Sequence, residues 1–405
     1  MPLTAFFSIF PQIKQALKKL CVLICFTFCI SASIFPQDSC NLRITLLTCA
    51  PGAELYSTFG HTAIRVQDGV TGLDEVYNYG TFEFAPDFYS KFVRGKLLYA
   101  LSVEGFNEFM YQYQMESRSV IEQSLSLTCP QKLQLFDALR ANAQPQNKAY
   151  RYDFLFDNCT TRARDMVDTG SGGSVAFKNI LSPKPPTFRN LIDIYLNRAN
   201  QDWSKLGIDL LLGAKMDRQA SNTEAMFLPD NLLKAFDSTT LDGRPLVNGK
   251  QTILPMPSVA SESLPITPII AFGLLLVIIT VLTLTDRKWA QMLVGVLDFL
   301  LFFILGAVGV LLLFMWFGTD HALCANNYNL IWALPTHAVA AFFVHKKRHG
   351  VQQYFKIVFW ITVVLLISWG FLPQQMNGGF LPLVAAVAIR SRVLYKKKKN
   401  GVKGA

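Results

Sequence analysis

Cys159 and His61 have the side-chain types that nucleophilic catalysis needs, although they lie far apart in the chain. Cys159 follows Asp157 and Asn158, which favour the start of a helix, so its thiol is expected in the first helical turn. The positive end of the helix dipole stabilises a thiolate there and lowers the pKa of the cysteine. A nearby imidazole accepts the thiol proton. The sequence therefore predicts Cys159 as a nucleophile, His61 as its base and the Cys159 main-chain N–H as an oxyanion donor.

A third residue is needed to hold the imidazole in one orientation. His61 begins a stretch of alternating apolar residues, and a second such stretch, containing Asn78, follows a turn around residues 68–74. The two stretches predict an antiparallel hairpin, and symmetry about its turn places Asn78 across from His61. Asn78 is therefore the predicted third catalytic residue. Ser57, just before the His61 strand, is the alternative for this role or a donor to substrate.

A structural interpretation of the same residues is the alternative to catalysis. Many cysteines are small buried core residues, and many histidines are satisfied polar groups. Two features favour catalysis. His61 is the only histidine between residues 34 and 237. Cys159 follows helix-capping residues, where a cysteine that serves only core packing has no special reason to lie.

The elements around these residues indicate an α+β domain. Residues 82–99 are aromatic and basic, which suits contact with a membrane surface, and residues 207–230 are expected to form loops and short elements. Strands are expected over residues 41–49, 119–127 and 150–156, and helices over residues 130–143, 188–196 and 231–236.

The C-terminal part of the chain is apolar enough to cross a membrane several times. A span needs about 20 predominantly apolar residues. The candidates are residues 266–284, 290–317, 329–344, 355–372 and 380–393. Basic clusters follow the first, third and fifth stretches, whereas the opposite loops contain no lysine or arginine. Because basic loops stay in the cytoplasm, the domain before the first stretch is predicted to lie on the other side.

The N-terminus and the segment before the spans complete the predicted organisation. Three lysines, an apolar run and small residues indicate a signal peptide or signal anchor. A stretch rich in Pro, Ser, Thr and Gly indicates a linker before the membrane. The predicted regions are the signal segment 1–33, the exported domain 34–237, the linker 238–265, the transmembrane domain 266–395 with about five helices, and the basic cytoplasmic tail 396–405.

Charge and cysteine usage exclude some functions. Much of the net charge of +10 lies at the membrane boundary, and no basic stripe with interleaved aromatics indicates a nucleic-acid partner. The chain has no paired CxxC spacing, so no metal site and no cofactor are expected. Disulfides persist outside the cytoplasm, and with Cys159 as a free thiol at most one pair can form among Cys40, Cys49 and Cys129, with the pairing left open.

Several long stretches resemble the Lnb family of lipoprotein N-acyltransferases. They are YSTFGHTAIRV from residue 56, YNYGTFEF from residue 77, YDFLFDNCTTRARD from residue 152, GIDLLLG from residue 207, MFLPD from residue 226 and the membrane-edge stretch 319–337. The resemblance implies a circularly permuted papain-like fold, as in NlpC-type peptidases and lecithin:retinol acyltransferase, in which the histidine precedes the cysteine. It assigns nucleophile and base to Cys159 and His61.

The resemblance also implies an activity and a location. The activity is transfer of an acyl chain from a membrane phospholipid, through a cysteine thioester, to the α-amine of diacylglyceryl-cysteine on a processed lipoprotein. The location is the bacterial inner membrane, with the catalytic domain in the periplasm and the C-terminus in the cytoplasm. Two alternatives stand beside it: a membrane-anchored cysteine peptidase acting on cell-wall peptides, and a non-catalytic assembly factor.

Four further residues are candidates for substrate binding. Arg162 and Arg164 would bind a headgroup phosphate, or else form a solvated helix face. Asp320 and His321 are expected at the outer membrane edge, near a lipid site, or else in a simple polar loop. Asp298 lies within a predicted span, where a carboxyl is costly and either functional or close enough to the cytoplasm to reach water.

Overall fold

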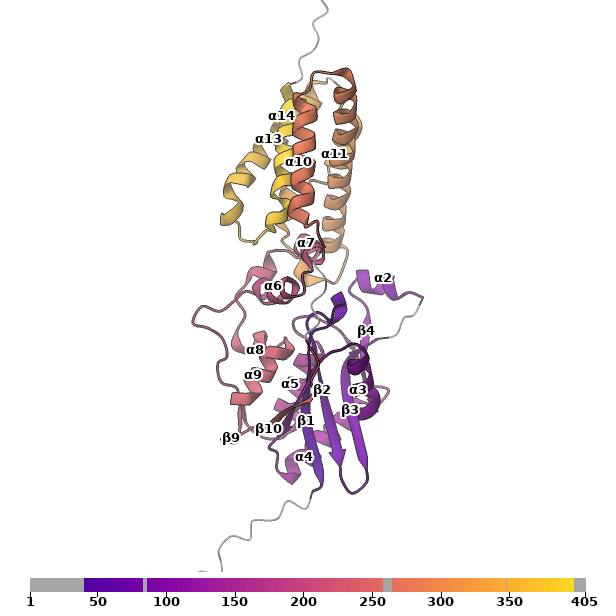
Figure 1. Cartoon of the computed structure of the whole chain (residues 1–405), viewed down its shortest axis with the longest axis vertical. Coiled ribbons are helices and arrows are strands. Elements are labelled where there is room, and N and C mark those ends of the chain that lie inside the picture. Colours follow the sequence, from indigo (N-terminus) through magenta and orange to yellow (C-terminus); the bar gives the residue numbers. More distant parts are fainter. Residues whose placement is uncertain (1–39, 83–85, 258–263, 347, 397–405) are drawn as a thin grey trace, which may run out of the picture.

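The computed structural model describes residues 40–82, 86–257, 264–346 and 348–396. A sheet-containing domain lies at one end of the long axis and a helical bundle, coloured orange to yellow, lies at the other (Figure 1). The predicted signal segment 1–33 lies outside the described residues, as does the tail 396–405 beyond Lys396.

The first domain is built on an antiparallel sheet of seven strands in the order β10-β5-β1-β2-β3-β4-β6. The predicted hairpin is confirmed, because β2 pairs with β3 from Ile64–Tyr77 to Asp68–Leu73. The strands are β1 (Leu42–Cys49), β2 (His61–Asp68), β3 (Leu73–Thr81), β4 (Leu98–Gly105), β5 (Val120–Leu125), β6 (Ala149–Arg151) and β10 (Val247–Leu254).

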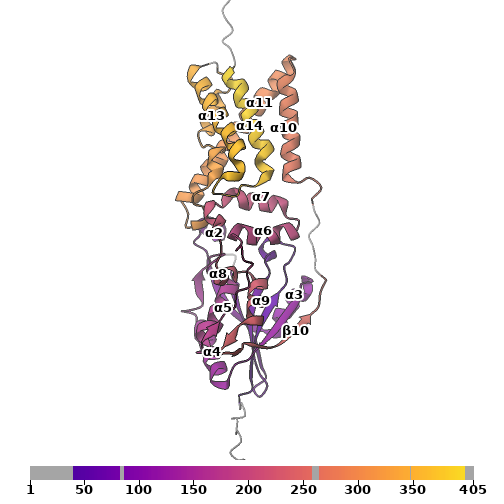
Figure 2. The same cartoon turned by 90° about the vertical axis from the view of Figure 1, so that its left-hand side faces the viewer.

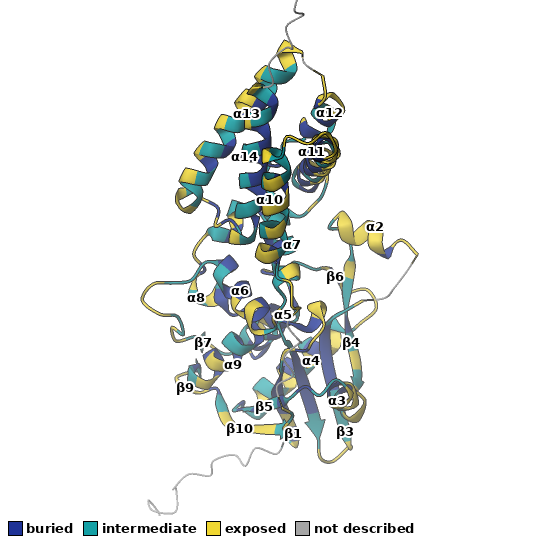
Figure 3. Cartoon of the chain, turned by 45° about the horizontal axis from the view of Figure 1, so that its top comes forward, coloured by how far each residue is buried: buried dark blue, intermediate teal, exposed yellow. Residues whose placement is uncertain are grey.

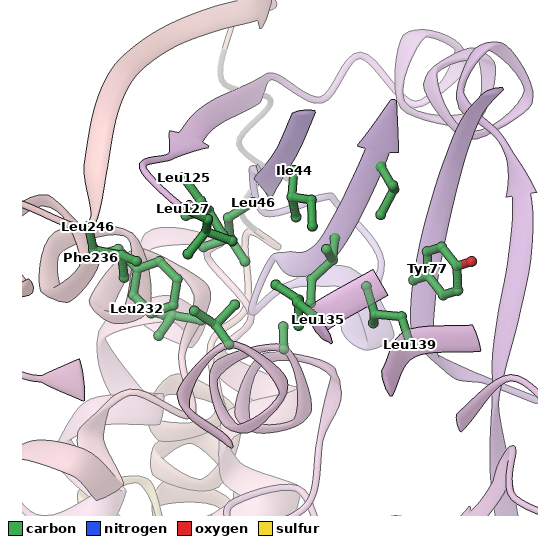
Figure 4. Close-up of a cluster of buried hydrophobic side chains, with 14 of the residues drawn as sticks. Ile44, Leu46, Tyr77, Leu125, Leu127, Leu135, Leu139, Leu232, Phe236 and Leu246 are labelled. Carbon is green, nitrogen blue, oxygen red and sulfur yellow. The ribbon is translucent and has the colours of Figure 1, made fainter. Parts of the chain in front are cut away.

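Helices cover both faces of this sheet. The helices α4 (Cys129–Asn142), α5 (Cys159–Gly170) and α9 (Pro229–Ser238) pack on one face, and α3 (Phe106–Met115) packs on the other. Nearly every residue of β1 is buried, as expected for a central strand with both faces covered. Figure 4 shows the larger core, in which Ile44 and Leu46 of β1 meet Leu135, Leu139 and Leu232 of the helices.

Two parts of the first domain differ from the sequence prediction. The predicted linker 238–265 contains β10, which pairs with β5 along the sheet edge. Most of its residues are exposed and polar, so this edge strand resembles a linker in composition. A small second sheet joins β7 (Val175–Ala176), β8 (Thr240–Leu241) and β9 (Arg244–Pro245).

The segment expected to be loop also contains a helix. The stretch 207–230 overlaps α7 (Asp202–Leu211), which is followed by η3 (Ala214–Asp217) and α8 (Asn222–Ala225). Gly207 lowers the intrinsic helix propensity of α7. Leu206, Leu210 and Leu211 pack into the core of the membrane bundle, and this packing stabilises the helix.

The second domain is helical. Its long helices are α10 (Pro268–Leu284), α11 (Lys288–Phe317), α13 (His349–Ser368) and α14 (Leu381–Lys396). Three helical stretches, 288–317, 349–371 and 378–396, are long and apolar enough to span a membrane, and α10 is a shorter apolar helix. Arg390 of α14 makes a two-pronged ion pair with Asp298 of α11 at 2.6 and 2.8 Å, so this buried carboxylate is paired inside the bundle.

The third predicted span, 329–344, is not one continuous helix. It consists of η5 (Tyr328–Ile331), α12 (His337–Ala340) and η6 (Ala341–Phe343). Irregular backbone at membrane depth must be buried in protein. Gly306 and Gly309 of α11 allow this, because a Cβ at either position would collide with the main chain at Ala338 or Ala333. These two glycines therefore let the broken segment pack closely against α11.

A polar junction joins the two domains. The helices α6 (Phe188–Arg198) and α7 lie between the sheet and the bundle (Figure 2). Arg189 of α6, only 1% exposed, pairs with Asp209 at 2.7 Å and Asp217 at 2.9 Å. Asn377, on the bundle side, donates to the same Asp209 at 2.8 Å. Asn329 donates to main-chain oxygens of α7. The ion pairs of Arg189 hold α6, α7 and η3 together, and the bonds from Asn377 and Asn329 fix this layer against the bundle.

Candidate active site

Cys159 is the first residue of α5, as the sequence predicted. The Asn158 side chain caps the helix by accepting from the main-chain N–H groups of Thr160 at 2.9 Å and Thr161 at 2.8 Å. Its amide nitrogen is held in turn by the carbonyls of Phe154 and Phe227, both at 2.9 Å. Among the described residues the N–H of Cys159 has no acceptor, and an N–H in the first turn points out of the helix start.

His61 is the first residue of β2, and its ring is fixed by Asn78 of β3. The distance from His61 Nε2 to Asn78 Oδ1 is 2.6 Å. Continuing the hairpin register places Gly80 directly opposite His61, so Asn78 is a diagonal neighbour on the same face rather than the exact partner. The predicted contact is present, although the register differs from the predicted one by two residues.

A residue that sequence reasoning missed, Glu104 of β4, fixes the amide of Asn78. Asn78 Nδ2 donates to Glu104 Oε1 at 2.7 Å, so the amide oxygen must face the imidazole. That oxygen only accepts, and Nε2 of His61 therefore carries the proton. The other ring nitrogen, Nδ1, is left as the base for the hydrogen bond between His61 and Cys159. The hydrogen bonds form a chain from Glu104 to the sulfur.

The electrostatics favour an ion pair between the two side chains. Burial alone would raise the pKa of Cys159, but the charge and hydrogen bond of His61, with help from Thr62 N–H and the Thr160 hydroxyl, lower it to about 7. Burial would lower the pKa of His61, but the thiolate and Asn78 outweigh it and raise that pKa. Cys159 is also a free thiol. As the pH rises through about 7, the pair becomes a thiolate and an imidazolium.

A second cysteine, Cys49, lies beside the pair, and its thiol resists ionisation. Cys49 lies directly across from His61 in the β1–β2 ladder. Burial raises the pKa of Cys49 to about 12, and the nearby Arg118 only partly opposes this. Cys49 therefore stays a neutral thiol where Cys159 is ionised, and only Cys159 has the properties of a nucleophile.

Two family models match this chain. A model described as the Lnb N-terminal periplasmic domain matches residues 37–193, and one described as the Lnb transmembrane domain matches residues 260–400. The chain belongs to the Lnb family. No curated protein and no solved structure matches it significantly. The Lnb periplasmic domain thus contains His61 and Cys159, and the Lnb transmembrane domain contains α10 to α14.

The Ser57 side chain is not directed at the imidazole of His61. It ends η2 (Leu55–Ser57), and its hydroxyl donates to the Glu54 carbonyl at 3.0 Å. The hydroxyl is buried in the turn before β2. This side chain supports the turn that delivers His61, and the third position next to the ring is taken by Asn78.

The two arginines of α5 are already engaged by protein groups. Arg162 makes a bidentate pair with Asp157 at 2.6 and 2.9 Å, and its guanidinium carbon lies 3.6 Å from the centre of the Tyr150 ring. Arg164 bonds Asp165 and the Thr223 carbonyl. Tyr150 and Thr223 come from other elements, so the local sequence could not show these two contacts. Neither guanidinium is arranged as an open phosphate site.

Asp320 and His321 lie in the loop after α11, where the Lnb transmembrane domain meets the periplasmic one. Asp320 N–H donates to the Arg94 carbonyl at 3.0 Å, and His321 Nε2 lies 2.9 Å from the Phe92 carbonyl. Both contacts hold the short helix α2 (Phe88–Val93) against the bundle. The Asp320 carboxylate also lies 3.5 Å from Arg151 of β6. The pair therefore joins the two domains beside β6 and is not in contact with Cys159.

Within the described ranges, no cluster of three or more histidine, cysteine or acidic side chains is arranged to hold a metal ion.

Gly80 brings Cys159 close to the sheet. Its φ of +89° lies in the left-handed region, and a Cβ there would be 3.5 Å from the Cys159 Cβ. Gly80→Ala is expected to destabilise the protein by about 1–2 kcal/mol because of the backbone strain. Gly69→Ala is the matched control, since nothing lies within 4 Å of a Cβ there. Urea unfolding of both variants checks the difference, and equal stabilities would contradict it.

The role of Glu104 is testable through the reactivity of the thiol. Glu104→Ala removes the bond that orients Asn78, and we expect alkylation of Cys159 by iodoacetamide at neutral pH to slow by about tenfold. Glu104→Gln keeps an acceptor for the Asn78 amide and should recover most of the rate. A wild-type rate in Glu104→Ala would mean that Asn78 needs no such support.

Proposed function

We propose that this Lnb-family protein is an N-acyltransferase that moves an acyl chain from a membrane phospholipid to the α-amine of diacylglyceryl-cysteine on a processed lipoprotein. The observation that carries the proposal is the Cys159–His61 ion pair at the start of α5, with the imidazole oriented by Asn78. A thiolate with a base beside it is the arrangement that acyl transfer through a thioester needs. The order of histidine before cysteine is in keeping with a permuted papain-like domain.

The first step forms the thioester. The Cys159 thiolate attacks the ester carbonyl of the phospholipid, a carbon–sulfur bond forms, and the carbonyl electron pair moves to oxygen. The Cys159 N–H stabilises that oxyanion. When the carbonyl reforms, the carbon–oxygen bond of the ester breaks. His61 gives its Nδ1 proton to the leaving lysophospholipid oxygen.

The second step transfers the acyl chain. The α-amine of the lipoprotein cysteine attacks the thioester carbonyl, and neutral His61 accepts a proton from the nitrogen. Collapse of the second oxyanion breaks the carbon–sulfur bond and regenerates the thiolate beside the imidazolium. Through both steps the bond from Nε2 to Asn78 keeps Nδ1 directed at the reacting atoms.

The position of the site supports lipid substrates. The β2–β3 turn lies at the end of the domain away from the bundle, so the start of β2 lies on the bundle side (Figure 1). On that side α2 carries Tyr89, 74% exposed, and Phe92, 51% exposed; Figure 3 shows this helix as mostly exposed beside the bundle. Exposed aromatics with the neighbouring basic Arg94 and Lys96 suit the headgroup region of a membrane.

The orientation follows from the charge distribution. The basic clusters after α10, before α13 and at the end of α14 lie at one end of the bundle, and the periplasmic domain lies at the other. By the positive-inside rule this distribution supports a C-terminus in the cytoplasm of an inner-membrane protein.

Mass spectrometry of lipoprotein N-termini tests the function. Cells with the wild-type protein should carry an amide-linked acyl chain on lipoprotein cysteine, and cells lacking the protein or carrying Cys159→Ala should not. Unchanged lipoproteins together with altered cell-wall peptides would support a peptidase instead. A Cys159→Ala protein that retains full activity would indicate a non-catalytic assembly factor.

A further inference from the structure

One buried hydroxyl next to Cys159 has no role in the steps above. Tyr150 lies on β6, is only 7% exposed, and its hydroxyl oxygen has no hydrogen-bond partner among the described residues. A buried hydroxyl without a partner costs about 1–3 kcal/mol. Such a group in a candidate catalytic site points to a ligand that completes its hydrogen bonding.

The hydroxyl lies close to the side chain of the nucleophile. A Cβ on Gly80 would lie 3.9 Å from the Tyr150 hydroxyl oxygen and 3.5 Å from the Cys159 Cβ. The two side chains therefore converge over the main chain of Gly80. Gly80 carries no side chain that could come between the hydroxyl and the Cys159 side chain.

The tyrosine is held firmly and stays protonated. The Arg162 guanidinium covers one face of its ring at 3.6 Å, and Arg162 is itself locked by Asp157. Burial raises the pKa of Tyr150, and the thiolate at Cys159 raises it further, while Arg162 only partly opposes them. The hydroxyl thus remains a donor over the pH range in which Cys159 is ionised, and the cation over the ring favours donation to an anion.

We propose that the Tyr150 hydroxyl is a catalytic oxyanion donor that acts together with the main-chain N–H of Cys159. The inference rests on the acyl transfer proposed above. When the thiolate adds to an acyl carbonyl, the new oxyanion accepts one hydrogen bond from each group; when the carbonyl reforms, both bonds weaken. Tyr150 keeps its proton throughout, and His61 makes all the proton transfers.

Tyr150→Phe tests this assignment because it removes only the oxygen and leaves the ring on Arg162. The full-length protein in detergent is mixed with a p-nitrophenyl acyl ester, and the burst of p-nitrophenolate reports acylation of Cys159. We expect this rate to fall by about 10²–10³-fold in Tyr150→Phe, as for loss of an oxyanion-hole donor. The pH profile of alkylation by iodoacetamide, which forms no oxyanion, should match wild type.

A neighbouring tyrosine provides the matched control. Tyr79 is buried beside Tyr150, but its hydroxyl donates to Asn142 at 2.8 Å, away from the sulfur. Tyr79→Phe should leave both rates unchanged. The proposal is overturned if Tyr150→Phe is acylated at the wild-type rate, or if acylation and alkylation slow by the same factor, because the tyrosine would then act on the thiolate or the fold.

The same measurement separates this inference from the proposed function. A wild-type protein that reacts with the p-nitrophenyl ester but takes no acyl chain from phospholipid would refute the lipid acyltransferase while the comparison at Tyr150 still stands. A wild-type protein in which no ester acylates Cys159 would overturn both.

Discussion

Full-length protein carrying Cys159→Ala should gain no mass when incubated with phospholipid, whereas the wild type should gain one acyl chain. The added chain should be released by neutral hydroxylamine, as expected for a thioester. The reason is that Cys159 combines a pKa of about 7 with a hydrogen-bonded base. Removing a nucleophile of this kind lowers turnover by at least about 10⁴-fold, which is complete loss in this assay.

Cys49→Ala is the control for this experiment. Cys49 lies across the strand from His61, so it shares the same surroundings, but its pKa is raised to about 12. The variant should still take up one acyl chain. Acylation of Cys159→Ala, or loss of acylation only in Cys49→Ala, would show that the nucleophile is assigned to the wrong sulfur.

Replacing His61 with glutamine should move the reactivity of Cys159 to higher pH. In the wild type the thiolate forms as the pH rises through about 7 and is lost below that value. Without the imidazolium, burial is no longer opposed by its largest stabilising partner, so the pKa of Cys159 rises. Each unit of that rise lowers the thiolate fraction near pH 7 by up to about tenfold. Iodoacetamide alkylation followed across pH 5 to 10 measures the midpoint.

His321→Gln is the matched control for the pH profile, because this histidine bonds the Phe92 carbonyl at the domain junction. Its profile should coincide with that of the wild type. An unchanged midpoint in His61→Gln would mean that another group lowers the pKa of Cys159. A loss of reactivity at every pH would instead indicate a folding defect, which circular dichroism distinguishes.

The core of the candidate site was predictable because its signals are local. Asn158 directly precedes Cys159, so the capped helix start is visible in four consecutive residues. The hairpin joins His61 and Asn78 through a short turn, so counting from the turn brings them together to within two residues. Both signals rest on neighbours in sequence, where propensity and pattern are most informative.

Glu104 and Tyr150 could not be found in this way. Each reaches the site through sheet pairings, β3 with β4 and β4 with β6, whose registers depend on the whole domain. The same limit applies to Arg162: Asp157 is close in sequence, but the ring of Tyr150 that its guanidinium covers comes from another strand. Contacts that depend on the pairing of several strands leave no spacing pattern in the sequence from which they could be predicted.

The larger differences have similar causes. The strand β10 is polar because it lies at a sheet edge, so its composition resembles that of a linker. The helix α7 is stabilised by the bundle that it meets, not by its own sequence. The segment 329–344 is apolar like a span, but its backbone breaks where glycines of α11 admit it.

The buried hydrogen bonds between α7 and the bundle limit how the protein can work. Separating the domain from the bundle would break the bonds that Asn329, only 1% exposed, and Asn377 make to α7, at a cost of about 1–3 kcal/mol for each buried group left without a partner. A hinge motion of the sheet-containing domain relative to the bundle, as a way to bind substrate, is therefore disfavoured. The sheet-containing domain is expected to stay at a fixed distance from the membrane surface. The ester or amine of each proposed lipid substrate must then leave the membrane to reach the Cys159 sulfur.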